Sequence, residues 1–177
     1  MNEELFPVVD ELGNIVGAAK RSECHSGSMI LHPVVHLHVL DEHGNILLQK
    51  RSSAKDIQPG KWDTAVGGHV DLGENIRTAL MREAGEELGI DASQAEFIEF
   101  YVFQSSVERE LVYTHVLKVL SDNLPEIKFD PVEIDEVRFW SPEELKNSLD
   151  KGILTENFVM EYRKLSSRFE EIVCRKN

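Results

Sequence analysis

The segment Gly68–Ile90 constrains this chain most, because it places acidic residues at helical spacing directly after a glycine-rich turn. Within it a helix is predicted over Asn75–Leu88, since apolar residues recur near the 3.6-residue helical period at Ile76, Ala79, Leu80, Ala84 and Leu88. On that helix Glu83 and Glu87 are one turn apart and Glu86 lies beside them. Close carboxylates repel unless a divalent cation that prefers oxygen ligands binds between them, so the segment predicts a cation site.

The alternative for three carboxylates is a solvated acidic face, which is the common fate of a charge run. The spacing of the whole segment argues against it, because nine positions over 23 residues fit one pattern that carries a mechanism. This pattern resembles the signature of the Nudix hydrolases, which cleave a diphosphate linked to some other group. The resemblance is carried by Gly68, Glu74, Arg82, Glu83, Ala84, Glu86, Glu87, Gly89 and Ile90.

Composition limits the partners. The net charge is −13 with His neutral, and such a surface repels nucleic acid and anionic membranes. We therefore expect a small-molecule diphosphate substrate, with metal ions or a local basic patch offsetting the negative field. No secretory-type start and no apolar stretch of membrane-spanning length is present, so a soluble cytoplasmic protein is expected. Cys24 and Cys174 have no CxxC partner and are expected to be small buried or half-buried thiols.

Alternating and turn-bounded segments predict two hairpins, which pair residues 6–9 with 15–19 and 33–40 with 45–51, and a third hairpin or meander formed by 95–103 and 111–120. In the second, Val35, Leu37 and Val39 alternate with His36 and His38, so one sheet face is aliphatic and the other carries imidazoles. The remaining segments are predicted as irregular structure over 21–29, a loop over 52–64, short strands over 65–67 and 136–140, and a closing amphipathic helix over 155–173.

Strands outnumber helices, and one helix lies between two groups of strands. This order favours the α+β class, a mixed β-sheet with flanking helices. The family resemblance implies a Nudix-type α/β/α sandwich. With 177 residues, one domain over 1–177 is expected, with 1–30 as an N-terminal hairpin extension and 155–177 as a C-terminal helix.

Diphosphate hydrolysis needs charge neutralisation, an activated water and a positioned leaving group, and divalent metals can serve all three. The expected ligands of Mg²⁺ or Mn²⁺ are Glu83, Glu86 and Glu87, with the backbone carbonyl near Gly68. Arg82 is expected to pair with Glu74 or Glu86, as the resemblance also implies. For Glu74, capping the helix is the alternative role.

Basic and aromatic residues precede the box. Arg51, Lys55 and Lys61 are candidates for phosphate contacts, with solvated loop lysines as the alternative for the last two. Trp62 is a candidate to stack on a substrate group, or else a packed loop anchor. As general base we rank Glu86 or Glu87 first, and the other acidic residues that qualify by position are Glu108, Glu110, Glu133 and Glu136.

Outside the box, the chain resembles one branch of the same superfamily, the isopentenyl-diphosphate isomerases and their Nudix relatives. The resemblance is carried by residues 8–25, the pair His25 and His32, residues 47–64, Gly68-His69, and Glu108 with Glu110. It implies a candidate second metal site formed by His25, His32, His69, Glu108 and Glu110. Three imidazoles and two carboxylates suit Mn²⁺ or Zn²⁺ better than Mg²⁺.

The chain departs from the isomerases at the residues that move protons. They carry an acid/base cysteine directly before the glycine-histidine pair, where this chain has Gly67, and they use a late tryptophan, whereas no tryptophan follows Trp140 here. Their hydrolase box is degenerate and this one is complete. The sequence therefore favours hydrolysis of a diphosphate, with an isomerase or a non-catalytic diphosphate-binding module as alternatives. A homodimer is also expected, from the apolar stripe of the last helix and the N-terminal hairpin.

Overall fold

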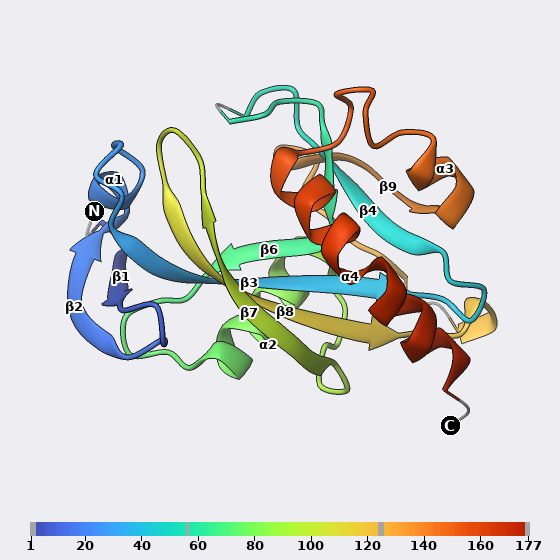
Figure 1. Cartoon of the computed structure of the whole chain (residues 1–177), viewed down its shortest axis with the longest axis horizontal. Helices are drawn as coiled ribbons and strands as arrows, with labels where there is room; N and C mark the ends of the chain where they lie inside the picture. Colours follow the sequence, from blue (N-terminus) through green and yellow to red (C-terminus); the bar gives the residue numbers. More distant parts are fainter. Residues whose placement is uncertain (1–2, 56, 124–125, 176–177) are drawn as a thin grey trace.

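The computed structural model describes residues 3–55, 57–123 and 126–175, which form an α/β/α sandwich (Figure 1). A seven-stranded sheet is the middle layer, with α2 (Ile76–Leu88) on one face and α4 (Glu156–Cys174) on the other. A separate two-stranded sheet lies at the N-terminal end of the molecule. The predicted α+β class, a mixed sheet with flanking helices, is confirmed.

Strand β3 (Leu31–Leu40) is the central strand of the sheet. It runs parallel to β8 (Arg109–Lys118) along its whole length, and β8 pairs antiparallel with β7 (Glu96–Gln104). All ten residues of β3 are buried. The predicted hairpin of residues 95–103 and 111–120 therefore exists, and it completes one half of the sheet.

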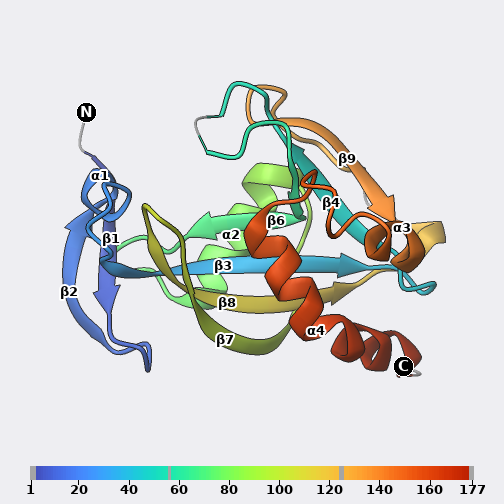
Figure 2. The ribbon, with the colours of Figure 1, turned by 45° about the horizontal axis from the view of Figure 1, so that its top comes forward.

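The other half of the sheet is split. Strand β6 (Val66–His69) pairs with the middle of β3, whereas β4 (Ile46–Arg51) pairs only with the last two residues of β3. Strands β5 (Trp62–Thr64) and β9 (Ile134–Trp140) flank β4. Strands β4 and β6 pair with different parts of β3. They therefore diverge from each other, and the sheet splits between them (Figure 2).

Helix α2 is defined by its two ends and its apolar face. The side chain of Asn75 caps the first turn by accepting from Thr78 N, and Gly89 ends the helix in the left-handed conformation at φ 66°. Its buried residues, Ala79, Leu80, Ala84 and Leu88, pack with Val35, Leu37 and Val39 of β3. The predicted aliphatic face of β3 is the face that α2 covers.

Helix α4 covers the opposite face, and Thr155 caps its first turn. Its apolar stripe is buried in the second core cluster, formed in part by Phe158, Tyr162, Leu165, Phe169 and Ile172. The stripe that motivated the dimer prediction is thus occupied by the molecule's own sheet. Residues 176–177 of the predicted terminal helix lie outside the described residues.

The N-terminal hairpin consists of β1 (Leu5–Val9) and β2 (Ile15–Lys20), as predicted, and is followed by a short helix, α1 (Arg21–Cys24). The prediction of irregular structure over residues 21–29 was therefore partly wrong, because the first four of these residues form one helical turn. The hairpin contacts the box loop, since Leu72 N donates to Leu5 O at 2.8 Å. Residues 1–2 of the predicted extension lie outside the described residues.

Two further predictions are corrected. Residues 62–64, placed in a loop, form β5, because they pair with β4 and Trp62 also bridges to Leu154. Cys174 is exposed at the end of α4, whereas Cys24 is buried as expected. Ser141 forms a capping box at the start of α3 (Pro142–Lys146), and Ser121–Asn123 adds a 3-10 turn. Within the described ranges, no helix combines the length and apolar character needed to span a membrane.

Candidate active site

Arg82 of α2 joins four groups around the box. Its Nε and Nη2 donate to the two carboxylate oxygens of Glu74 at 3.1 and 2.9 Å, and its Nη1 donates to Glu83 at 2.7 Å and Glu86 at 3.3 Å. Nη2 also donates to the carbonyl of His69 at 2.9 Å, which ties α2 to β6. The expected pairing of Arg82 is present with both Glu74 and Glu86. The hydrogen bond from Arg82 lowers the pKa of Glu74. The helix is capped by the next residue, Asn75, and not by Glu74.

Glu83 lies directly against the backbone of Gly68. A Cβ built on Gly68 would overlap the Glu83 carboxyl group, so only glycine allows this approach. Burial raises the pKa of Glu83, although the bond from Arg82 acts in the opposite direction. The carboxylate and the backbone of β6 are therefore close enough to serve one cation together, and the residues fit the expected metal.

Glu87 reaches the split in the sheet. Its Oε2 accepts from Gln49 Nε2 at 3.0 Å and from Gly67 N at 3.3 Å. Burial, with the nearby charge of Glu83, raises the pKa of Glu87 to about 8. Glu86 differs, because its side chain is 63% exposed and pairs with Arg82. Two confined acidic groups therefore lie near β6, while the third predicted ligand lies at the solvent edge.

Three histidines from different segments converge beside the box. The ligand-type nitrogens of His25, His32 and His69 lie within 4.8 Å of one another, and the Nε2 atoms of His25 and His69 are 3.0 Å apart. Phe6 of β1 stacks on the His69 ring at a centroid distance of 4.4 Å. The hairpin extension thus helps to order an imidazole that belongs to the box segment.

The hydrogen bonds of these histidines fit a metal-binding role. His32 Nδ1 donates to Ile30 O at 3.0 Å, and its buried Nε2 has no hydrogen-bond partner among the described residues. His25 Nδ1 donates to Glu108 at 2.8 Å, which leaves its Nε2 lone pair facing His69. Burial lowers the pKa of His32 and holds that of His69 well below its usual value, so both are neutral, as ligands must be.

The two late glutamates of the expected five-ligand site are placed differently from the histidines. Glu108 accepts a hydrogen bond from His25 Nδ1, the ring nitrogen that does not face His69, and thereby orients the His25 ring. Glu110 lies in the adjoining pocket, where burial and the charge of Glu108 raise its pKa to about 7. The compact group in the described part of the chain consists of the three histidines.

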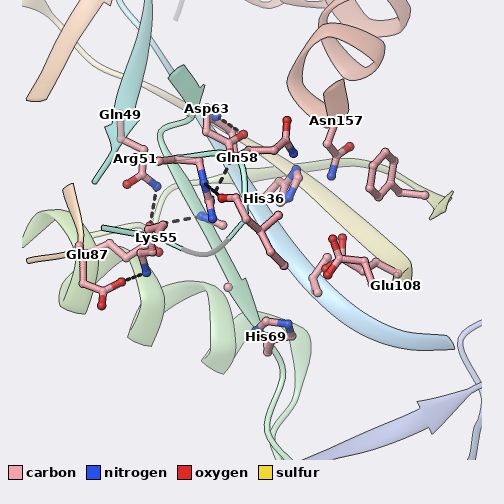
Figure 3. Close-up of a pocket in the computed structure, with 18 of the residues that line it drawn as sticks. His36, Gln49, Arg51, Lys55, Gln58, Asp63, His69, Glu87, Glu108 and Asn157 are labelled. Atoms are coloured by element: carbon pink, nitrogen blue, oxygen red, sulfur yellow. Dashed lines mark hydrogen bonds and ion pairs between the residues drawn. The ribbon is translucent and has the colours of Figure 1, made fainter. Parts of the chain in front are cut away.

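A pocket of about 200 Å³ lies where the sheet splits, as Figure 3 shows. It is lined by β4 and β6 and by β3, β8 and the start of α4, with Gln49, Gly67, His36, Glu110 and Asn157 as examples. A second hollow of about 410 Å³ is lined by Arg82, Glu83, Glu86 and Glu87, among others. The two share Arg21, His69, Glu87, Glu133 and Ile134, so the box opens into the pocket.

Two of the predicted phosphate contacts line the pocket. Arg51 Nη1 lies 3.4 Å from Asp63, and Lys55 pairs with Glu133. Burial and the nearby charge of Arg51 lower the pKa of Lys55. The described side chains therefore place cations opposite the box carboxylates.

The other predicted contacts lie elsewhere. Lys61 lines a shallow hollow against α4, and Trp62 is 8% exposed and packs edge-on against Trp140. Of the two roles predicted for Trp62, its position therefore fits the packed anchor and not stacking on a substrate group. Among the acidic candidates for the base, Glu133 lines both hollows, whereas Glu136 is exposed on β9.

Several pocket residues were missed by sequence reasoning. Arg21 lines both hollows and is held by Glu4 at 2.8 Å, and Gln49, Gln58, Asp63, His36 and Asn157 line the pocket. For Arg21 the available signal was its position in the sequence, four residues before the predicted metal ligand His25. His36 lies on the predicted imidazole face, and Gln49, Gln58 and Asp63 lie within the segment 47–64 that carries the resemblance, but their approach to one pocket depends on contacts between distant segments.

Comparison with known proteins gives a family match. Residues 30–161 match the model of the NUDIX domain. A Yersinia pestis protein named an uncharacterized Nudix hydrolase is 32% identical over 175 residues, covering 93% of both chains. Isopentenyl-diphosphate Delta-isomerase 2 of Photorhabdus laumondii is 32% identical over 133 residues, covering 73% of this chain and 74% of that one. Relatives at similar identity thus carry both kinds of name.

The fold has solved counterparts. The crystal structure of DR0079 from Deinococcus radiodurans matches with a TM-score of 0.74 at 23% identity, covering 91% of this chain and 98% of that chain. This likeness concerns the fold, and it includes the arrangement of one mixed sheet between helices.

Proposed function

Because the chain belongs to the Nudix family, we propose that it is a metal-dependent hydrolase that cleaves a diphosphate linkage in a small phosphorylated metabolite. The observation that carries the proposal is the complete box: Arg82 holds Glu74 and Glu83, and Glu83 and Glu87 approach the glycines of β6. A bound Mg²⁺ or Mn²⁺ would neutralise the diphosphate and acidify a water molecule.

The residues of the chain divide the remaining tasks. Glu83, Glu86 and Glu87, with the carbonyl of Gly68, would hold the ion, and Glu74 fixes Arg82. Of the two glutamates ranked first as general base, Glu87 has the stronger support, since it lines both hollows and Glu86 lines one.

Arg21, Arg51 and Lys55 are proposed to bind the phosphate oxygens. All three line the pocket, where each is paired with a carboxylate, and they would bind phosphate oxygens once a metal ion offsets the negative charge of the site. The histidine cluster is proposed to hold a second ion, with Glu108 orienting His25. Its neutral nitrogen donors fit Mn²⁺ or Zn²⁺.

The isomerase alternative concerns residue 67. A Cβ on Gly67 would make ordinary contacts of 3.5–3.7 Å, so the position has room for a side chain. Glycine nevertheless offers no group that transfers a proton. Hydrolysis is favoured for that reason, although the isomerases are equally similar in sequence.

The proposal is tested by a phosphate-release screen over nucleoside, sugar and isoprenoid diphosphates with Mg²⁺ or Mn²⁺. We expect turnover of at least one, and loss of both turnover and metal affinity in Glu87→Gln. A folded, metal-loaded sample that releases no phosphate, with unchanged metal affinity in Glu87→Gln, would contradict it. Conversion of isopentenyl to dimethylallyl diphosphate would support the isomerase, and thermal stabilisation by a diphosphate without phosphate release would support a binding module.

A further inference from the structure

A buried ion pair joins β3 to α4 behind the box. His36 Nδ1 donates to Glu161 Oε2 at 2.9 Å, and the Glu161 side chain is fully buried. Thr114 donates to the other oxygen of Glu161, and His38 Nε2 lies 3.1 Å from the first. The carboxylate is thus enclosed by donors, and the orientation of the His36 ring is fixed.

The second nitrogen of His36 faces the pocket. The missing side chain of Gly67 leaves that edge of the ring open, since a Cβ there would lie 3.6 Å from His36 Nε2. Gly67 N donates to Glu87 on its other side. One glycine therefore separates the box carboxylate from the imidazole, and the pocket runs past it from one to the other.

Asn157 lies at the same end of the pocket. In Figure 3 it comes from the start of α4 and lies on the His36 side, away from Glu87. Tyr101 OH donates to Asn157 Oδ1 at 2.8 Å, which leaves the amide nitrogen without a partner among the described residues. Burial raises the pKa of Tyr101, so its hydroxyl stays protonated and is able to donate this hydrogen bond.

His36 carries a proton on both nitrogens at neutral pH. Burial disfavours the imidazolium, but the charge of Glu161, with Asp63 and Glu110, outweighs burial and raises the pKa of His36 to about 9. His36 Nε2 and Asn157 Nδ2 are then two fixed hydrogen-bond donors at the end of a pocket whose other end holds the box.

We propose that these two donors bind oxygen atoms of the group attached to the diphosphate, so that the site selects a hydroxylated, sugar-like group over a hydrocarbon chain. The inference rests on the proposed function and adds the chemical class of the second group. A hydrocarbon bound in the pocket would cover both donors and leave them unpaired, and sites built to hydrogen-bond a substrate reject analogues that lack the acceptor.

The test compares three substrates that share a diphosphate and differ in the attached group. Ribose 5-diphosphate and isopentenyl diphosphate both carry five carbons, whereas methyl diphosphate lacks the group in question. With the full chain and Mn²⁺, we expect kcat/KM to be on the order of 100-fold higher for ribose 5-diphosphate than for isopentenyl diphosphate. Equal or better turnover of the isopentenyl compound would overturn the inference and leave the hydrolase proposal standing.

Asn157→Asp is the informative variant, because it keeps the shape and the acceptor for Tyr101 but removes the donor. It should lower the ratio of kcat/KM for ribose 5-diphosphate to that for methyl diphosphate by about 10- to 100-fold. Asn147→Asp, at the exposed residue that follows the last turn of α3, makes the same charge change as a control. An equal fall for both substrates would indicate a structural or charge effect and overturn the inference.

His36→Phe is a second variant with the same expected change of ratio, provided that circular dichroism shows the native fold. If no substrate releases phosphate, thermal stabilisation is measured with the same three ligands. A larger shift with ribose 5-diphosphate, abolished in Asn157→Asp, would retain the inference although the hydrolase proposal had failed. Equal shifts, or none, would overturn it.

Discussion

The carboxyl group of Glu83 occupies the space that a side chain at residue 68 would need. At the scale of single residues this contact brings one of the helix carboxylates directly against the strand backbone. Arg82 holds the same carboxylate from the other side at 2.7 Å. Glycine at 68 is therefore required by its neighbour and not by backbone conformation.

We predict that Gly68→Ala displaces Glu83 and weakens Mn²⁺ binding by at least about tenfold, because loss of one ligand or its orientation typically costs 10- to 100-fold in affinity. Isothermal titration calorimetry measures the affinity. Gly85→Ala is the matched control, since Gly85 is helical and a Cβ there meets nothing within 4 Å. That control should gain about 0.5–1 kcal/mol in free energy of unfolding and keep its metal affinity. Equal affinities in both variants would remove the role given to Gly68.

We predict that Mn²⁺ affinity depends on pH through Glu87. Its pKa is raised to about 8 in the folded protein, so below that pH a proton must leave before the carboxylate binds the ion. Affinity should rise by up to about tenfold per pH unit from pH 6 and level off above pH 8. Titration calorimetry between pH 6 and 9 checks this, and the slope should flatten in Glu87→Gln. A pH-independent affinity in the wild type would argue against this assignment.

At the scale of elements, α4 is held to the sheet by apolar packing and by one ion pair. Phe158 is fully buried beside Glu161, which is also fully buried. A buried carboxylate lowers stability when it loses its partner, so the helix and β3 depend on the protonation of His36.

We predict a stability change between pH 6.5 and 9 that depends on this pair. His36 has a folded-state pKa of about 9, above its usual 6.5, so its contribution is complete below about pH 6.5 and is lost as pH rises through 9. The loss is roughly 3 kcal/mol for a shift of this size. Urea unfolding of wild type and Glu161→Gln should give a difference that shrinks over this range. Glu171→Gln, an exposed change on the same helix, should parallel the wild type.

At the scale of the whole molecule, the family match begins at residue 30, after the hairpin. The hairpin segment nevertheless brings Phe6, Arg21 and His25 to the site. It also exposes apolar side chains at its outer end, since Leu12, Ile15 and Val16 are 78%, 65% and 64% exposed. One side of the N-terminal extension therefore contributes side chains to the site, and its outer end exposes apolar side chains to solvent.

Homodimerisation stays a prediction, now resting on the hairpin alone. Light scattering at micromolar concentration should give twice the 20.1 kDa chain mass, and Val16→Asp should return it to that of one chain, because a charge would be buried in the contact. A single-chain mass for the wild type would remove the prediction.

The sequence predicted what depends on local spacing. The α2 helix, the pairing of Arg82 with Glu74 and the two faces of β3 all follow from residues close together in the chain. Strand β5 was missed because three residues become a strand only through pairing with β4. The partner of His36 was missed because Glu161 lies 125 residues away. The histidine cluster came from resemblance, since its members are separated along the chain.

The adjacent glycines of β6 differ in what they permit. At Gly68 a Cβ atom would collide with Glu83, whereas at Gly67 a Cβ atom would make only ordinary contacts with His36 and Thr64. Folding and chemistry are therefore uncoupled at residue 67: a new functional group can enter between Glu87 and His36 with little loss of stability. Diversification of this scaffold toward other reactions would begin there, at a single codon, while the neighbouring codon stays fixed.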